Sequence, residues 1–420
     1  MEKQYWLYVE SYVYISIKKI SALFYNSYSG KILEYLDSPE IVELAKKLNS
    51  TRNLRMIKVN QQVLNIPRIR EFINRLRSDF MGDLLDCDYS EGKPVQFPPV
   101  GKIEKDVKYL KRDKDRSIGE DIMEYFSGLT VYLNNSCTNH CPFCSTAFKQ
   151  FPCCTASPKQ TELNLEQFES FLEPVETNRR IALTVAGGDI FAYSRFDALL
   201  KFLSRLSYSK TFLIHSLNAF KHLSELKMLS LPNAALDILI TPVETETVES
   251  TLKQVVEKIS AISIPARYSF IIHDESDFEK METLASLLSI DDPAIHVFYN
   301  GTNRDFFEKY IFIDRETIEA EKPSLKDIYS RQVINSAFFG SLTIRETGQI
   351  YSNLNRRLHG NIRNESLYEV LVKELRNGQS WRHTRSKIKP CKDCLYESLC
   401  PPVTNYNYVL EQYNLCNMFP

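Results

Sequence analysis

The sequence has almost no net charge and no long apolar run. Its 420 residues include 52 lysines and arginines against 53 aspartates and glutamates, which gives a formal net charge of −1. This balance offers no electrostatic basis for binding a nucleic acid. No apolar run approaches the ~18 residues of a membrane-spanning helix, and residues Met1–Glu10 lack the apolar segment of a secretory signal. We therefore expect a cytoplasmic protein with no membrane partner.

Disulfide bonds are not expected either, although the chain has 10 cysteines. Cytosolic proteins keep their thiols reduced, and clustered cysteines in such proteins favour metal binding. The isolated Cys87 has the character of a small buried hydrophobe. The other cysteines form three groups: Cys137, Cys141 and Cys144; Cys153 and Cys154; and Cys391, Cys394, Cys400 and Cys416.

The first group has the spacing C-x3-C-x2-C. A [4Fe–4S] cluster that is held by protein alone normally has four thiolate ligands. Three thiolates would leave one iron with an open position, as in a catalytic rather than a structural zinc site. A small molecule can be chelated at such a position. The alternative is that these cysteines bind zinc or share this spacing by chance.

Cys137, Cys141 and Cys144, with the aromatic Phe143 directly before the last cysteine, resemble the signature of the radical SAM enzymes. The resemblance implies that the three cysteines are catalytic ligands of a [4Fe–4S] cluster and that S-adenosylmethionine (SAM) chelates the open iron, with Phe143 at the cofactor. It also implies an electron donor such as flavodoxin or ferredoxin. One electron then cleaves SAM to a 5′-deoxyadenosyl radical, so the difficult chemistry belongs to the cofactor.

Short apolar strands alternate with helices over residues 128–300, which predicts a parallel sheet buried on both faces. The cysteine loop follows the first strand and should lie at the carboxyl-terminal rim, where active sites form. Six such units resemble the (β/α)6 partial barrel of the radical SAM family. Strands are expected at 129–133, 181–185, 211–215, 236–241, 267–273 and 295–299, with Asn164, Ser194 and Ser276 as helix N-caps.

Three strand ends supply further candidate contacts to SAM. The second strand ends in Gly187-Gly188-Asp189, where the family has a Gly-Gly-Glu-type motif whose backbone meets the methionine amino group. Glycine permits such close approach because it lacks Cβ, and Asp189 departs from the family's glutamate. At the next two strand ends the resemblance suggests that Asn218 and Thr241 hold the SAM ribose and carboxylate, with helix capping as the alternative.

Other residues near this rim have no assigned role. Glu244 is expected to join the SAM contacts or simply to begin its helix. For His140 and His273 the alternatives are a substrate contact and an ordinary surface position. For Cys153 and Cys154 they are substrate or persulfide chemistry and buried, inert thiols.

Residues 1–85 predict a small α+β unit of strands followed by two helices. This order resembles the winged-helix domain of peptide-modifying radical SAM enzymes, which captures the leader of a precursor peptide, typically as an added strand. The alternative is a purely structural subdomain. Residues 86–127 are rich in turn residues and predict a linker, with a short strand at 107–110 and a helix at 117–126. Residues 301–334 are expected to connect the barrel to the last domain.

Residues 335–420 predict a β-hairpin at 340–351, a helix at 367–377, Trp381, and the cysteines of a C-x2-C-x5-C motif followed by Cys416. This order resembles the SPASM extension of radical SAM peptide maturases, in a shortened form because no cysteines flank the hairpin. The resemblance implies one auxiliary [4Fe–4S] cluster. Zinc is the alternative, since four thiolates also suit tetrahedral Zn²⁺. The predicted ligands are Cys391, Cys394, Cys400 and Cys416.

Together these features predict an α/β radical SAM enzyme with a winged-helix-like N-terminal domain and a C-terminal iron–sulfur extension. The enzyme is expected to modify a ribosomally synthesised precursor peptide, and cross-linking is the expected modification. Two alternatives stay open: an inactive or partner-dependent scaffold that binds the peptide, and a maturase that acts on another enzyme.

Overall fold

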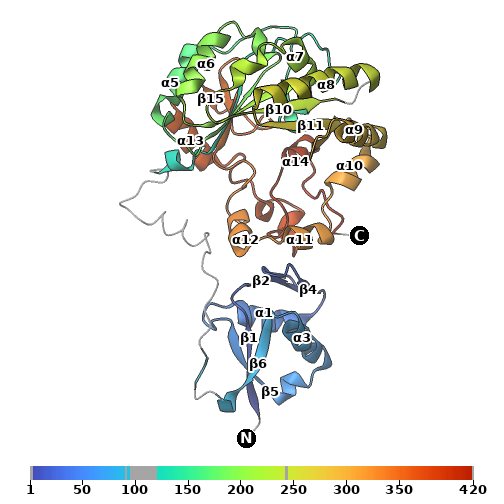
Figure 1. Ribbon diagram of the computed structural model, residues 1–420. Helices are drawn as coiled ribbons and strands as arrows, with labels where there is room; N and C mark the ends of the chain where they lie inside the picture. The colour runs from blue at the N-terminus through green and yellow to red at the C-terminus, as the bar shows by residue number, and fades with distance from the viewer. Residues whose placement is uncertain (1–2, 90–91, 95–120, 242–244, 419–420) are drawn as a thin grey trace.

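The computed structural model in Figure 1 describes residues 3–89, 92–94, 121–241 and 245–418. A large open sheet with helices on its outer face, called the barrel below, lies at one end of the molecule. The N-terminal domain lies at the other end, and C-terminal segments lie between them. The strand predicted at 107–110 lies outside the described residues, as does the beginning of the helix predicted at 117–126. The described end of that segment is a short 3₁₀ turn, Ile122–Tyr125.

The barrel contains a sheet of nine strands in the order β12-β11-β10-β9-β8-β7-β13-β14-β15. The strands from β7 to β12 pair in parallel with their neighbours, which confirms the predicted parallel sheet. Their apolar side chains are buried on both faces, as expected for strands that helices cover. The strands are β7 (Gly128–Tyr132), β8 (Ala182–Ala186), β9 (Ser209–His215), β10 (Ala234–Ile240), β11 (Ala266–Ile272) and β12 (Ala294–Val297).

Helices follow these strands and cover the outside of the sheet (Figure 1). Two predicted N-caps are wrong. Ser194 bonds to Glu162 instead, and α6 begins after Arg195. Asp274, rather than Ser276, accepts a backbone N–H in the first turn of its helix. Serine and aspartate cap helices about equally well, so the sequence could not choose between neighbours. The helices are α5 (Leu165–Leu172), α6 (Phe196–Arg205), α7 (Ser216–Lys221), α8 (Thr245–Ile262) and α9 (Glu275–Leu287).

The predicted C-terminal hairpin is present, and it extends the barrel sheet. Strand β13 (Ser341–Ile344) pairs in parallel with β7, and β14 (Gln349–Tyr351) returns antiparallel to β13. Gly348 has a φ of +78° in the turn, a conformation that glycine adopts without strain. A short strand, β15 (Gly360–Asn361), completes the sheet. The pairing places β13 beside the strand that leads into the cysteine loop.

Helix α13 (Leu367–Asn377) has the predicted bounds and carries a buried acid. The side chains of Glu374 and His359 are fully buried, and Glu374 Oε2 lies 2.7 Å from His359 Nε2. Glu374 Oε1 also accepts the backbone N–H groups of Ser380 and Trp381 at 2.8 and 2.9 Å. Burial alone would raise the pKa of Glu374, but these hydrogen bonds outweigh burial, and the pKa is lowered.

The N-terminal domain contains two three-stranded sheets, β5-β1-β6 and β2-β3-β4. The predicted strands and both predicted helices are present, whereas β6 was not predicted. The winged-helix character of this domain stays a prediction. Its elements are β1 (Gln4–Val9), β2 (Val13–Lys18), β3 (Ser21–Asn26), β4 (Ile32–Tyr35), α1 (Pro39–Asn49), β5 (Met56–Asn60), α2 (Gln61–Leu64), α3 (Pro67–Ser78) and β6 (Gly82–Asp86).

The sheet β2-β3-β4 packs on the C-terminal cysteine segment. Lys18 Nζ donates to the Lys392 carbonyl at 2.8 Å, and the Tyr396 hydroxyl lies 3.0 Å from Glu34 Oε2. Three helices precede the hairpin: α10 (Arg304–Ile311), α11 (Arg315–Glu321) and α12 (Leu325–Arg331). One apolar cluster joins the two parts and includes Tyr14, Leu23, Tyr25, Ile32, Ile318, Ile328, Tyr329, Cys394, Leu395, Tyr396, Leu399 and Cys400.

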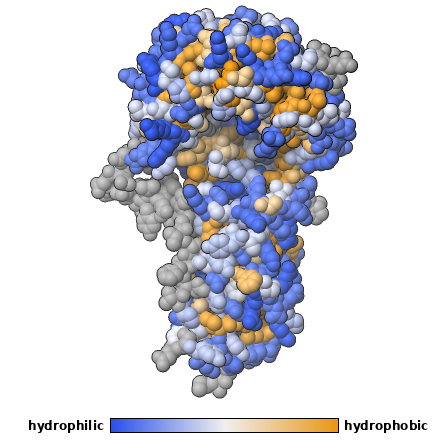
Figure 2. Space-filling view, in the orientation of Figure 1, coloured by the Kyte–Doolittle hydropathy of each residue, from blue (hydrophilic) through white to orange (hydrophobic). Residues whose placement is uncertain are grey.

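Apolar and polar residues are interspersed over the surface that Figure 2 displays, and the surface is hollowed below the barrel. Within the described residues, every helix is too short or too polar to span a bilayer.

Replacement of Glu374 tests the buried contact between Glu374 and His359. Glu374→Ala leaves His359 without its carboxylate and two backbone N–H groups without their acceptor. We expect a loss of about 3–5 kcal/mol in the free energy of unfolding, because each buried donor left without its acceptor costs about 1–3 kcal/mol. Chemical denaturation at neutral pH measures this loss. Tyr368→Ala, on the exposed side of the same helix, is the control and should change stability little. Equal stability of the two variants would contradict a stabilising role for the buried Glu374 side chain.

Since the folded-state pKa of Glu374 is lowered, its contribution to stability is present above the usual carboxyl pKa and is lost as the pH falls through the folded value. Glu374→Gln should therefore weaken the acid dependence of stability.

Candidate functional site

The cysteine loop begins where β7 ends and lies against the end of β8. The Asn134 side chain donates to the Asp189 carbonyl at 2.8 Å and accepts the Gly188 N–H at 3.0 Å. The Asp189 N–H donates to the Ser136 carbonyl at 2.6 Å. These bonds fix the backbone just before Cys137, so the first cysteine of the motif starts from a rigid position.

Glycine is required where the cysteine loop meets the turn that follows β8. A Cβ atom at Gly188 would lie 2.2 Å from the Ser136 carbonyl oxygen, and one at Gly187 would lie 3.0 Å from Asn134 Oδ1. Real Cβ contacts are not this short at Gly188, so any side chain there would push the cysteine loop away. The structure thus gives the two glycines a local role in holding the loop. Their contact with SAM stays a prediction.

His215, at the end of β9, is a site residue that the sequence did not reveal. Its Nδ1 accepts the Leu217 N–H at 3.2 Å, so the ring proton lies on Nε2. Nε2 lies 3.6 Å from Cys141 Sγ and 3.4 Å from Thr241 Oγ1. Burial lowers the pKa of His215 to about 4, which keeps the ring neutral at physiological pH. The one available signal was a histidine at a predicted strand end on the cysteine rim.

Asn218 links the cysteine loop to the Gly187-Gly188 turn. Its Nδ2 donates to the Gly188 carbonyl at 3.1 Å and lies 3.9 Å from Cys137 Sγ. Its Oδ1 accepts from Asn139 Nδ2 at 2.7 Å. The structure therefore brings Asn218 and the first cysteine together, as the predicted rim requires.

The other predicted contacts lie at the same rim. Thr241 is buried beside His215. The Asp189 carboxylate already has protein partners: its Oδ2 lies 3.1 Å from His222 Nε2, and its Oδ1 accepts a backbone N–H. The ring of Phe143 lies 5.3 Å from that of Phe298. Glu244 lies outside the described residues.

The loop thiols are electrostatically coupled. Hydrogen bonds from Cys141 and Cys154 lower the pKa of Cys144 to about 3, while the pKa of Cys141 is raised chiefly by its hydrogen bond to Cys144. A thiolate is the form that binds metal. Cys153 and Cys154 are buried in an apolar cluster at the barrel interior, with Cys154 hydrogen-bonded to Cys144, and both interpretations of the pair stay open.

These residues fit an iron–sulfur cluster with an open iron. The donor set is three thiols, each half-buried at the mouth of the barrel. His215 faces one sulfur and Asn218 faces another. Backbone and side-chain donors of this kind surround cluster sulfurs in proteins.

The second predicted site is formed from separate parts of the C-terminal region. Cys391, Cys394 and Cys400 are buried, whereas Cys416 is half-buried. An isolated parallel β-bridge pairs Cys416 with Ile313. Burial raises the pKa of Cys394 to about 11 and that of Cys400 to about 12, and the other cysteines of the group add to both shifts. These effects show that the thiols are neighbours, although no three of their sulfur atoms lie within 4.8 Å of one another. Cys394 and Cys400 would need a bound cation to become thiolates at neutral pH.

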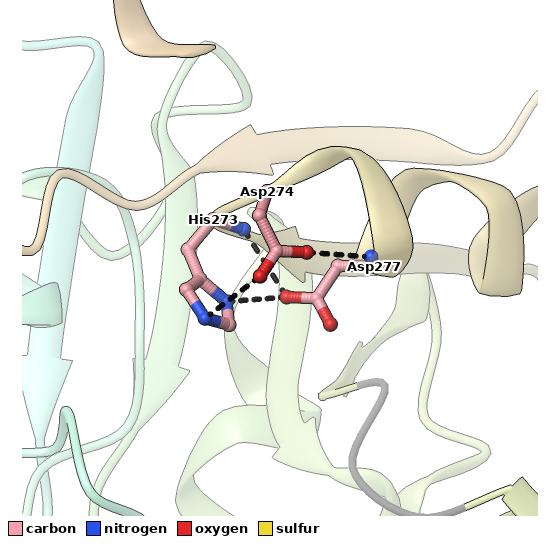
Figure 3. A group of neighbouring side chains, drawn as sticks. All are labelled: His273, Asp274 and Asp277. Carbon is pink, nitrogen blue, oxygen red and sulfur yellow. Dashed lines mark hydrogen bonds and ion pairs between the residues drawn. The ribbon is translucent and has the colours of Figure 1, made fainter. Parts of the chain in front are cut away.

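His273, Asp274 and Asp277 form another group with metal-ligand atoms, at the end of β11 (Figure 3). His273 pairs with both carboxylates. Asp274 caps α9 by accepting the Asp277 N–H at 2.8 Å, and Asp277 accepts the His273 N–H at 3.2 Å. Since these bonds account for the arrangement, the group is a helix N-terminus that carries no assigned function.

Comparison with known proteins gives a match in structure alone. No family model matches the chain, and no curated protein matches it. Among solved structures, the chain resembles one titled as Streptococcus suis SuiB bound to S-adenosylmethionine, with a TM-score of 0.51, 11% identity, and coverage of 98% of this chain and 99% of that chain.

Two further SuiB structures were found. One is titled as SuiB alone, with a TM-score of 0.49, 10% identity, and coverage of 98% and 99% of the two chains. The other is titled as SuiB bound to its precursor peptide SuiA, with a TM-score of 0.47, 13% identity, and coverage of 94% of each chain.

The fold is thus that of a mixed α/β protein with a large parallel sheet, similar to the fold of SuiB. The similarity to SuiB extends over nearly the full length of both chains. The resemblance to radical SAM peptide maturases that the sequence predicted is therefore confirmed at the level of fold. The arrangement of the N- and C-terminal domains, the site residues and the auxiliary cluster stay predictions.

Gly188→Ala tests the close approach at the cysteine loop. The added methyl group would collide with the Ser136 carbonyl, so the loop should move and lose its metal. We expect the iron content after anaerobic reconstitution to fall by about four atoms per chain, the content of one cluster. Gly92→Ala is the control, because no atom of the described residues lies within 4 Å of its added Cβ. Full iron content in Gly188→Ala would refute the proposed constraint.

Proposed function

We propose that this protein is a radical SAM enzyme that modifies a ribosomally synthesised precursor peptide, with cross-linking as the expected modification. The observation that carries the proposal is the position of the three loop cysteines. They lie at the carboxyl end of β7, fixed by Asn134 and by the glycines that follow β8. Active sites of barrels form at this edge of the sheet.

Each rim residue has a role in this proposal. Cys137, Cys141 and Cys144 would hold the cluster, which with SAM supplies a 5′-deoxyadenosyl radical when both are bound. His215 donates a neutral N–H toward Cys141, and Asn218 orients its amide toward Cys137. Phe143, Gly187, Gly188, Asp189, Asn218 and Thr241 are the proposed residues around SAM.

A peptide substrate is supported by the extent of the fold match. SuiB is covered over 99% of its length, including the regions that correspond to the N-terminal and cysteine-rich C-terminal parts of this chain. SuiB has been solved with its precursor peptide. In this chain, the outer strands β5 and β6 are sheet edges at which an extended leader peptide would add as a strand.

The role of the C-terminal cysteines is part of the same proposal. Cys391, Cys394, Cys400 and Cys416 would hold one auxiliary [4Fe–4S] cluster. The predicted total is then about eight iron atoms per chain. A flavodoxin or ferredoxin is the proposed electron donor.

SAM cleavage tests the activity directly. The anaerobically reconstituted protein, reduced with dithionite and given SAM, should form 5′-deoxyadenosine, which liquid chromatography detects. The triple variant Cys137→Ala, Cys141→Ala, Cys144→Ala should form none, whereas Cys87→Ala, an isolated cysteine far along the chain from the motif, should match the parent. An intact cluster that produces no 5′-deoxyadenosine would favour a peptide-binding scaffold instead.

A further inference from the structure

Arg385 is a buried cation at the C-terminal four-cysteine group, and none of the functions above uses it. It is 6% exposed and lies in a short turn that precedes the first cysteine of the group. Its Nη1 lies 3.5 Å from Cys391 Sγ. The guanidinium therefore points at a predicted metal ligand rather than at solvent.

The other contacts of Arg385 tie the cysteine-bearing segments together. Its Nε donates to the carbonyl of Pro401, the residue after Cys400, at 2.6 Å. Its Nη1 also donates to the Tyr413 carbonyl at 2.5 Å, three residues before Cys416. A planar guanidinium can make several such bonds from one fixed position. Arg385 is thus held in place by uncharged backbone groups on two sides.

No carboxylate among the described residues forms an ion pair with Arg385. Buried charges in proteins are normally paired or bound to metals, because an isolated buried charge costs several kcal/mol. The groups that can balance this charge are the neighbouring thiols, once they are ionised. The structure therefore has a permanent positive charge where four thiolates are expected.

We propose that Arg385 is the counter-cation of a four-cysteine iron–sulfur site and raises its reduction potential. The inference rests on the iron–sulfur assignment of this site within the proposed function. A cluster with four thiolates has a net negative charge that grows by one on reduction. A fixed cation and an N–H donor at a cysteine sulfur stabilise the reduced form more than the oxidised form. Arg385 therefore acts on the cluster electrostatically without taking part in its electron transfer, and the four-cysteine site is redox-active.

If the site instead binds zinc, no reduction potential is expected. Zn²⁺ has no redox chemistry, and its charge with four thiolates does not change. In that case Arg385 would serve only as a clamp between Pro401 and Tyr413. The two possibilities differ in the metal bound and in whether a potential exists to be shifted.

The test uses the full chain with Cys137, Cys141 and Cys144 replaced by alanine, so that only the C-terminal group can hold a cluster. The midpoint potential of that cluster is measured by reductive titration followed by electron paramagnetic resonance. Arg385→Gln should shift the potential to more negative values, because the charge is removed. Arg385→Lys keeps the charge and should lie between Arg385→Gln and the parent.

Arg331→Gln is the matched control. Arg331 donates to the carbonyl of Leu399, beside Cys400, at 2.6 Å, but it has Glu321 as an ion-pair partner at 4.0 Å. Its removal should leave the potential at the parent value. An equal shift in Arg331→Gln and Arg385→Gln would overturn the proposal, as would an unchanged potential in Arg385→Gln with its iron retained.

Loss of metal is also decisive. If Arg385→Gln loses iron while Arg385→Lys keeps it, the charge is required, which supports the proposal. If both lose it equally while remaining folded, Arg385 is only a clamp and the proposal fails. Zinc in place of iron at this site would also refute it. None of these results depends on SAM cleavage, which is measured on the chain with its loop cysteines intact.

Discussion

At Gly188 the backbone of the cysteine loop lies directly against the end of β8, with no space for a side chain. The rest of the site depends on this close approach. Asn134 bonds to both residues at the end of the turn, and Asn218 then joins the turn to the loop from the next strand. Adjacent parallel strands supply these groups, so the barrel itself sets the positions of the sulfur atoms.

Direct contacts between distant segments also connect the remaining parts of the chain. Strand β13 extends the barrel sheet beside β7, so the C-terminal region is fixed to the strand that leads into the cysteine loop. The C-terminal cysteines then share an apolar cluster with the N-terminal sheet β2-β3-β4. Through these contacts the N-terminal domain, the four-cysteine group and the barrel rim form one connected structure.

Sequence reasoning recovered what local patterns determine. The alternation of short apolar strands with helices predicted the parallel sheet, and α13 has the predicted bounds because its capping residue and apolar spacing agree. Contacts between distant residues were not predictable. The pairing of β13 with β7, the position of His215 beside Cys141, and the burial of Arg385 beside Cys391 all depend on tertiary packing. The strand-end position of His215 placed it at the cysteine rim, but only the folded structure shows which sulfur atom each of His215 and Arg385 faces.

The central claim is that the loop cysteines hold a cluster whose fourth iron is open to SAM. The most direct measurement is the electron paramagnetic resonance spectrum of the reduced protein, recorded before and after SAM is added, in a chain with Cys391, Cys394, Cys400 and Cys416 replaced by alanine. The account predicts a signal that changes on addition of SAM, because the molecule binds iron. A cluster signal that SAM leaves unchanged, or the absence of any cluster in a folded protein, would contradict it.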